Sequence, residues 1–363
     1  MTKLNKVVIV GPLPPPAGGM ANQTRQLAAF LRAENIDVDI VQVNADYKPA
    51  WVGKVPVLRA FFRLAFYLLR LSKQLKSADV VHIMANSGWS WHLFAAPAIW
   101  IASRLNKPII LNYRGGYARD FFNKSWSRVA KSLAKVQTVV VPSAFLQQVF
   151  SDFGQSAQVI PNVLNEQLFC PQDHMLEAEA PHIIVTRNLE AIYDVASAIN
   201  IFARVKVQYP QARCSIAGTG PELLALKQQV ETLNLADSVT FTGRLSPVEM
   251  AKLYQQADIM LNTSTVDNTP NSIIEALACG TPVVSTDVGG IAKLVRHQYD
   301  ALLAPQGEID TLANAVLSLL AQRQLREQLI GHGLTTVEKF QWRNVWLSLQ
   351  TCYRDAIKNT PIN

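Results

Sequence analysis

At 363 residues the chain is too long for one ordinary hydrophobic core, so we expect two domains. Hydrophobic residues make up 49% of the chain and charged residues 17%, a balance that excludes a disordered protein. The four cysteines form no CxxC pair, which argues against a zinc or disulfide framework and favours a reducing cytosol. The N-terminal apolar stretch is too short for a signal peptide, and no run of eighteen uncharged apolar residues predicts a membrane span.

Net charge is unevenly divided along the chain. Residues 1–168 carry 19 Lys and Arg against 8 Asp and Glu, which gives +11, whereas the remainder carries 15 against 19, which gives −4; the sum is +7. A basic half attracts anionic surfaces or substrates. No nucleic-acid-binding motif accompanies the charge, so we expect no nucleic-acid partner. The remaining candidate partners of the basic half are an anionic lipid surface and a lipid diphosphate.

Short β-branched runs alternate with longer helical patterns along the whole chain, which predicts βαβ units around parallel sheets. In the first half the predicted strands are 6–11, 37–43, 79–84, 108–113, 138–143 and 157–162. In the second half they are 182–187, 213–218, 238–243, 258–263 and 281–286. Pro171, Pro181 and an acidic stretch interrupt the pattern and place the joint between the halves near 163–181.

These patterns predict an α/β fold of two Rossmann-like, doubly wound domains, residues 1–168 and 169–344. We expect the aromatic helical tail at about 345–363 to pack back on the first domain. Ligands of open parallel sheets bind beyond the carboxyl ends of the strands, so chemistry is expected in the loops that follow them.

The first such loop contains Gly18 and Gly19, which precede a helix. Glycines let backbone N–H groups approach a phosphate, and a helix N-terminus favours negative charge. Their spacing does not match the G-x-G-x-x-G of nicotinamide-binding proteins. The alternative is a glycine pair that serves only a tight turn.

The strongest signal is DNTPNSIIEALACGTPVVSTDVGG, residues 267–290. A helix that starts at Pro270-Asn271-Ser272 presents N–H groups that can hold a diphosphate. Glu275, early in this helix, can accept hydrogen bonds from ribose hydroxyls, and Asp267 on the preceding loop can reach a sugar on the diphosphate. The alternative is that both acids only cap the helix and complement its dipole.

This segment closely resembles the nucleotide-sugar site of retaining glycosyltransferases of family 4, the group 1 glycosyltransferases. Their pattern is a Glu, seven residues, a second Glu, a small-residue helix, Gly-x-Pro-Val-Val and a double glycine. Other pieces agree in order: GPLPPPAGGM, VPSAFLQQVF, VIPNVLNEQLF, IAGTGPE, VTFTGRLSPVEMAKLYQQADIMLNTS and the C-terminal FQW. The resemblance covers nearly the whole chain and implies the GT-B fold, two Rossmann-like domains facing a central cleft.

The resemblance also implies a role for each matched residue. Glu275 would bind the ribose, Asp267 would face the donor sugar, and Arg187 would neutralise the leaving diphosphate, so these three are the catalytic candidates. The other donor-binding candidates are the backbone of Asn271, Ser272 and Ile273 for the distal phosphate, Arg244 and Leu245 for the base, Leu277 for the ribose, and the loop glycines Gly18, Gly19 and Gly218.

Three positions depart from the family pattern. Asp267 replaces the usual first Glu with a shorter side chain, and Ile192-Tyr193 stands where a Lys is usual. The usual His-Gly of the first domain appears as Asn112-Tyr113-Arg114-Gly115-Gly116, so Arg114 is the candidate replacement for the missing cation. Arg114, Gly115, Gly116, His82 and His92 are the acceptor-side candidates; for each His, a packed or solvated ring is the alternative.

The resemblance therefore implies a cytoplasmic retaining glycosyltransferase that moves a sugar from a nucleoside diphosphate sugar, with UDP-sugars preferred, to a glycan or lipid-linked acceptor in envelope or exopolysaccharide assembly. We expect no metal and no cofactor, because the donor is itself the substrate. Two alternatives remain open: a nucleotide-sugar-binding protein that has lost turnover, and a nucleotide-sugar epimerase on the same fold.

Residues 54–76 predict an amphipathic helix. Arg59, Arg63, Arg70 and Lys73 form a basic stripe, opposite Leu58, Phe61, Ala65, Leu68, Leu69 and Leu75. One interpretation is an interfacial helix that docks the basic domain on the inner face of the cell membrane. The other is an ordinary helix that covers a sheet.

Overall fold

The computed structural model describes residues 4–15, 19–45, 56–172 and 179–360, without the side chains of residues 56–62. The chain forms two compact units, Met1–Val163 with Trp342–Asn363 and Leu164–Gln341, which are described separately. The chain leaves the first unit at 163/164, where the sequence predicts 168/169, and returns to it at 341/342, where the sequence predicts 344/345.

The first unit is built on a six-stranded parallel sheet in the order β2-β1-β3-β4-β5-β6. The strands are β1 (Lys6–Gly11), β2 (Asp37–Gln42), β3 (Val80–Ala85), β4 (Ile109–Tyr113), β5 (Thr138–Val141) and β6 (Gln158–Val159). The helices are α1 (Gly19–Ala33), α2 (Pro56–Gln74), η2 (Leu75–Ser77), η3 (Trp91–Ala95), α3 (Ala96–Arg104), α4 (Ala118–Leu133), α5 (Ala144–Asp152) and α13 (Trp342–Lys358).

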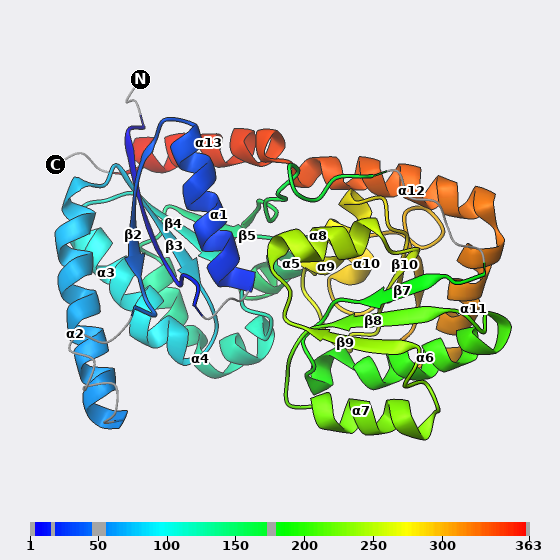
Figure 1. Ribbon diagram of the computed structural model, residues 1–363. Coiled ribbons are helices and arrows are strands. Elements are labelled where there is room, and N and C mark those ends of the chain that lie inside the picture. Colours follow the sequence, from blue (N-terminus) through cyan, green and yellow to red (C-terminus); the bar gives the residue numbers. More distant parts are fainter. Residues whose placement is uncertain (1–3, 16–18, 46–55, 173–178, 361–363) are drawn as a thin grey trace. The chain divides into compact units, whose positions relative to one another are not determined.

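Helices cover both faces of this sheet (Figure 1). Successive strand residues point to opposite faces, so β-branched runs are buried on both sides. On one face Val8 and Val10 pack in a core with α2, α3, α4 and α5. On the other, Val7 and Ile9 pack in a core with α1 and α13. The C-terminal helix thus completes the first unit, although it follows the whole of the second in sequence.

The second unit repeats this plan with the strand order β12-β11-β10-β7-β8-β9. Its strands are β7 (His182–Val185), β8 (Arg213–Ala217), β9 (Val239–Gly243), β10 (Ile259–Asn262), β11 (Val283–Thr286) and β12 (Leu302–Ala304). Its helices are η4 (Ala191–Tyr193), α6 (Val195–Gln208), α7 (Leu223–Thr232), α8 (Pro247–Gln255), α9 (Asn271–Ala278), α10 (Ile291–Leu294), α11 (Ile309–Ala321), α12 (Arg323–Val337) and η5 (Glu338–Phe340). The edge strand β12 has only three residues and is not among the predicted strands.

Strand order fixes where each sheet can bind a ligand. From β7 the chain moves one way through β8 and β9, and then the other way through β10, β11 and β12. The order therefore reverses between β7 and β10, and the loops that leave the carboxyl ends of these two strands diverge there.

Among the described helices, none combines the length and the apolar character that a membrane span needs.

Candidate functional site

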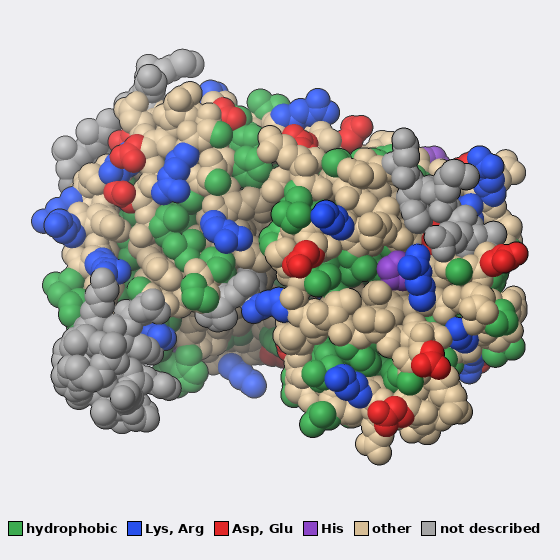
Figure 2. Space-filling view, in the orientation of Figure 1, with side chains coloured by type: hydrophobic (Ala, Val, Ile, Leu, Met, Phe, Trp, Pro, Cys, Tyr) green, Lys and Arg blue, Asp and Glu red, His purple; other side chains and the backbone are tan. Residues whose placement is uncertain are grey.

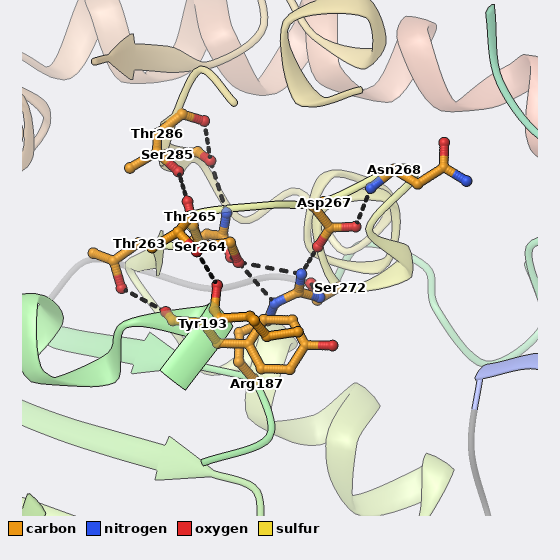
Figure 3. Close-up of polar contacts among 12 residues, drawn as sticks. Arg187, Tyr193, Thr263, Ser264, Thr265, Asp267, Asn268, Ser272, Ser285 and Thr286 are labelled. Carbon is orange, nitrogen blue, oxygen red and sulfur yellow. Dashed lines mark hydrogen bonds and ion pairs between the residues drawn. The ribbon is translucent and has the colours of Figure 1, made fainter. Parts of the chain in front are cut away.

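A cluster of polar side chains lies at the carboxyl ends of β7 and β10, where the strand order of the second unit reverses (Figure 3). Arg187 comes shortly after β7, and Ser264 follows β10. Asp267 and Ser272 come from the loop and the helix that continue from β10. Residues far apart in sequence are thus brought together by the topology that binds ligands in doubly wound sheets.

The guanidinium of Arg187 is the centre of this cluster. Its Nε and Nη2 donate to Ser264 Oγ at 3.3 and 3.2 Å, and its Nη1 donates to Ser272 Oγ at 3.1 Å. Its Nη2 also pairs with the Asp267 carboxylate, and the two side chains are only 10% and 13% exposed. Burial lowers the pKa of Arg187, but an arginine stays protonated near neutral pH. The unit therefore holds a fixed positive charge at its ligand-binding edge.

Tyr193 covers the same guanidinium. The Arg187 Cζ lies 4.4 Å from the centre of the Tyr193 ring, a cation–π geometry. The end of β10 holds the Tyr193 loop in place: Thr263 Oγ1 donates to the carbonyls of Tyr193 and Asp194, and the Thr265 N–H donates to the Ile192 carbonyl at 2.8 Å. At the position where a Lys is usual, this chain thus has an aromatic ring that orients the remaining cation.

Buried polar residues behind Arg187 fix the orientation of Ser264. The Ser264 hydroxyl donates to Asn262 Oδ1 at 2.8 Å, which directs its lone pairs toward Arg187. Asn262 in turn donates to Ser285 on β11, and Thr286 Oγ1 donates to the Ser264 carbonyl. Because all four side chains are almost fully buried and partnered, the Arg187 acceptor is rigid before any ligand binds.

The double glycine that ends the predicted motif lies directly against the Asp267 loop. A Cβ on Gly289 would lie 2.2 Å from the Asp267 carbonyl oxygen, and one on Gly290 would lie 1.7 Å from that of Asn268. The Gly290 N–H also donates to the Asp267 carbonyl at 2.9 Å. Only glycine permits this approach, so the pair holds the loop that carries the Asp267 carboxylate.

Glu275, in the second turn of α9, lies partly buried next to Tyr254 and Arg187. Burial raises the pKa of Glu275 to about 8, although hydrogen bonding by Tyr254 and the charge of Arg187 both act to lower it. The Tyr254 hydroxyl also lies 2.8 Å from Thr186 Oγ1, just after β7. The carboxyl group is thus neutral near pH 7 in the ligand-free protein.

The start of α9 has the form that the sequence predicts for a phosphate-binding helix. Its N-cap is Pro270, which provides no side-chain cap. Ser272 faces Arg187, whereas Ile273 is fully buried, so only its backbone could meet a ligand. Backbone N–H groups and the Arg187 charge thus lie at the same end of the helix, where an anion is stabilised.

The other donor-binding candidates differ in how accessible they are. Gly218 lies against the Arg187 loop, where a Cβ would come 2.1 Å from the Arg187 carbonyl oxygen, so its role is to allow this packing. Arg244 is exposed and Leu245 half-buried, just after β9. Leu277 was predicted to pack on the ribose, but it is 2% exposed and faces Gly333 of α12, so that prediction is wrong.

The acceptor-side candidates of the first unit follow β3 or β4, except His82, which lies within β3. Arg114 and Gly115 are largely buried, and Gly116 is exposed. His82 was a candidate for the acceptor side, but it is fully buried within β3 and bonded to Tyr353 and Asn112, so it cannot contact an acceptor. His92 is half-buried against the Phe121 ring. Gly19 begins α1, and Gly18 lies outside the described residues.

Sequence reasoning missed four residues that the structure adds to this site: Ser264, Tyr254, Thr186 and Asn262. Ser264 had a usable signal, since the polar run Asn-Thr-Ser-Thr begins at the last residue of an otherwise apolar strand, at the ligand-binding edge. Tyr254 had none, because an aromatic residue on the apolar side of a helix reads as core. Within the described part of the chain, no group of three His, Cys, Asp or Glu side chains converges as a metal site would.

Comparison with known proteins places this arrangement among glycosyl-transferring enzymes. A family model described as "Glycosyl transferases group 1" matches residues 171–334, and one described as "Glycosyltransferase Family 4" matches residues 17–168. A similar protein is the alpha-monoglucosyldiacylglycerol synthase of Streptococcus pneumoniae, 26% identical over 94% of this chain and 84% of its own length. Another is the N-acetyl-alpha-D-glucosaminyl L-malate synthase of Bacillus anthracis, 25% identical over 57% of this chain but only 55% of its own length.

Solved structures share the fold over nearly the whole chain. HepE of Anabaena, solved with UDP and with UDP-glucose, superposes with a TM-score of 0.72 at 17% identity in its UDP complex, covering 96% of this chain and 99% of HepE. Sucrose-phosphate synthase of Thermosynechococcus elongatus gives 0.74 at 20% identity, covering 98% and 99%. These likenesses confirm the predicted GT-B fold class.

Proposed function

The chain belongs to the group 1/family 4 glycosyltransferases, and from this membership we propose that it transfers a sugar from a UDP-sugar to a glycan or lipid-linked acceptor, with retention of anomeric configuration. The observation that carries the proposal is the Arg187 guanidinium, held by Ser264 and Ser272 at the start of α9. Such a cation next to a helix N-terminus suits the diphosphate of a nucleotide sugar. HepE, solved with UDP and UDP-glucose, supports the choice of base, and the pneumococcal relative, named for a glucosylated diacylglycerol, supports a lipid-linked acceptor.

In the proposed reaction the diphosphate competes with Asp267 for Arg187. A diphosphate carries more negative charge than one carboxylate and can take two N–H groups of the fork. Its arrival frees the Asp267 side chain to accept hydrogen bonds from the donor sugar. As the sugar–phosphate bond breaks, charge grows on the diphosphate, where Arg187 and the α9 N–H groups stabilise it. The acceptor oxygen bonds to the anomeric carbon on the same face, and the leaving diphosphate takes the acceptor's proton. No resident cofactor has a role in this scheme.

One experiment tests both the donor preference and the role of Asp267. A panel of nucleoside diphosphates and their sugars, scored by thermal shift, should select UDP and a UDP-sugar, because a ligand at a hundred times its Kd stabilises by about 2.7 kcal/mol. Asp267→Asn should bind UDP at least as well as the native protein, since the competing carboxylate is gone, yet release UDP from the sugar roughly tenfold to a hundredfold more slowly.

Each alternative function has its own outcome in this assay. Native protein that binds UDP-sugars and never releases UDP would be a binding protein without turnover. Conversion of the UDP-sugar to an isomer, with UDP still attached, would indicate an epimerase. Weakened UDP binding in Asp267→Asn would contradict the proposed competition between the carboxylate and the diphosphate.

We also propose that the protein works in the cytoplasm, peripherally bound to anionic membrane through α2. On the described part of this helix Phe66 and Leu69 are exposed, at 46% and 68%, beside exposed Arg70 and Lys73. The sequence predicted Leu69 on the buried, apolar side of the helix, and that prediction is wrong. An exposed apolar residue beside basic ones is, however, what an interfacial helix needs. The Arg59 side chain lies outside the described residues, and Arg63 is half-buried.

Binding to vesicles tests this membrane contact. On the face that Figure 2 shows, most Lys and Arg side chains are scattered among other residues. The native chain should sediment with anionic vesicles at low salt and stay in solution at 1 M salt, where the Debye length falls to about 3 Å. Replacement of Arg59, Arg63, Arg70 and Lys73 by Gln should remove about 1 kcal/mol of binding per charge. Native protein that stays in the supernatant at low salt would contradict the proposal.

A further inference from the structure

A chain of buried hydrogen bonds crosses the first unit and ends at Arg114. Tyr353 Oη, on α13, lies 2.9 Å from His82 Nδ1, and His82 Nε2 lies 3.1 Å from Asn112 Nδ2. Asn112 Oδ1 accepts from Arg114 Nε at 3.1 Å, and Arg114 Nη1 donates to Asn162 Oδ1. Tyr353, His82 and Asn112 are at most 4% exposed, so the chain is rigid and largely shielded from water.

The donor at the end of this chain fixes the direction of every bond in it. Arginine only donates, so the Asn112 atom that faces it is the oxygen, and the Asn112 amide must donate to His82 Nε2. His82 then carries its proton on Nδ1 and donates to Tyr353. Burial lowers the pKa of His82 to about 3, with Arg114 acting in the same direction, so the ring is neutral. Although α13 follows the whole second unit in sequence, it thereby helps to orient the Arg114 guanidinium.

Arg114 stays charged although it is largely buried. Burial lowers its pKa to about 10, so the group is still a cation near pH 7. Both of its partners are amide oxygens, and among the residues that the structure describes no carboxylate pairs with it. An uncompensated cation that is largely desolvated costs free energy, which favours a functional reason for its retention.

The guanidinium also has donors to spare at an accessible position. Two of its five N–H groups are used by Asn112 and Asn162. Nη2 has no hydrogen-bond partner among the described residues. It is not completely buried, so a ligand can reach it from solvent. Arg114 follows β4 directly, at the carboxyl edge of the sheet, where ligands of such sheets bind.

From this geometry we propose that Arg114 is a phosphate-binding residue of the first unit, held ready by the Tyr353–His82–Asn112 chain. The free Nη2 edge suits phosphate oxygens, which arginine binds through paired N–H groups. The phosphate comes either from the donor's diphosphate or from a phosphorylated acceptor. Only the choice of these two sources rests on the proposed function, because Arg114 lies in a different unit from the Arg187 site.

Calorimetry on the full chain with Arg114→Gln tests the proposal and separates the two sources. The Gln amide nitrogen takes the place of Nε and can still bond to Asn112, but the variant lacks the charge and the bond to Asn162. If the donor is the source, UDP should bind at least tenfold more weakly to the variant, while uridine binds equally to both proteins. If a phosphorylated acceptor is the source, UDP affinity should not change, and inorganic phosphate should bind to UDP-saturated native protein but not to the UDP-saturated variant.

Two further variants make the result specific. Arg128→Gln, on the exposed side of α4, removes the same charge and should change neither titration. Arg114→Lys keeps the charge without the planar fork and should bind phosphate between the native and Gln levels. Equal UDP and phosphate binding in native protein and a folded Arg114→Gln would overturn the proposal and leave Arg114 as a structural tie to Asn162. Absence of UDP binding in the native chain would instead count against the proposed function, while its phosphate titration would still test Arg114.

Discussion

Replacement of Arg187 by Lys should lower kcat/KM for the UDP-sugar by about a hundredfold or more, with the fold intact. The guanidinium makes three hydrogen bonds to two serines and an ion pair with Asp267, and a single ammonium cannot reproduce that fork. A hydrogen bond to a charged group contributes roughly 1.5–3 kcal/mol, and at least two such bonds would be lost to the diphosphate in the transition state. Because Tyr193 occupies the usual Lys position, no second cation at that position can compensate.

The measurement is initial-rate UDP release over a range of donor concentrations, with thermal unfolding to show that the variant is folded. Arg204→Lys on α6 is a matched control, since that arginine is 45% exposed and pairs with the exposed Asp310. A fall in kcat with KM nearly constant would assign Arg187 to the transition state. Near-native kinetics would mean that another cation, with Arg114 the first to examine, holds the diphosphate.

The fold could be predicted from the sequence because parallel sheets leave a strong signal. Central strands buried on both faces read as short β-branched runs, and β1 and β8 follow the predicted ranges closely. The edge strand β12 was missed because three residues between turns leave no such run. The helix that starts at Asn271 was predicted because proline, a polar pair and then an apolar run are a strong local start signal.

The site was predictable only as far as single side chains carry their own signal. Asp267 and Glu275 were placed in one motif and Arg187 was assigned to the same site by the resemblance, but their mutual contacts depend on how β7 and β10 adjoin. Leu277 and His82 were misassigned because sequence does not say which face of an element is buried. The Arg114 chain was invisible, because Tyr353 joins His82 from 271 positions away.

Replacement of Glu275 by Gln should stabilise the free protein while weakening its affinity for UDP-glucose. The folded-state pKa of about 8 exceeds the ordinary carboxyl pKa of 4.5. Between these two values the folded protein holds a proton that the unfolded chain has released, so stability falls as pH rises through that window. The variant, with a neutral side chain of the same shape, has no such loss. At pH 8 the free energy of unfolding of the variant should exceed that of the native protein by about 1–3 kcal/mol, which appears as a higher Tm. The difference should vanish near pH 4.5.

Binding should respond in the opposite direction, because an ionised carboxylate accepts hydrogen bonds from both ribose hydroxyls and an amide cannot. Affinity for UDP-glucose should fall by roughly ten- to a hundredfold in Glu275→Gln. Binding that requires the ionised form must also release a proton near pH 7 in the native protein, and calorimetry in two buffers of different ionisation enthalpy measures that release directly. UDP-glucose is the suitable ligand, because its diphosphate has no group that titrates near neutrality, and Glu249→Gln on the exposed start of α8 is the control. A Gln variant that is less stable at pH 8 than the native protein, and binds UDP-glucose equally well, would show that Glu275 serves the packing of α9 rather than the nucleotide.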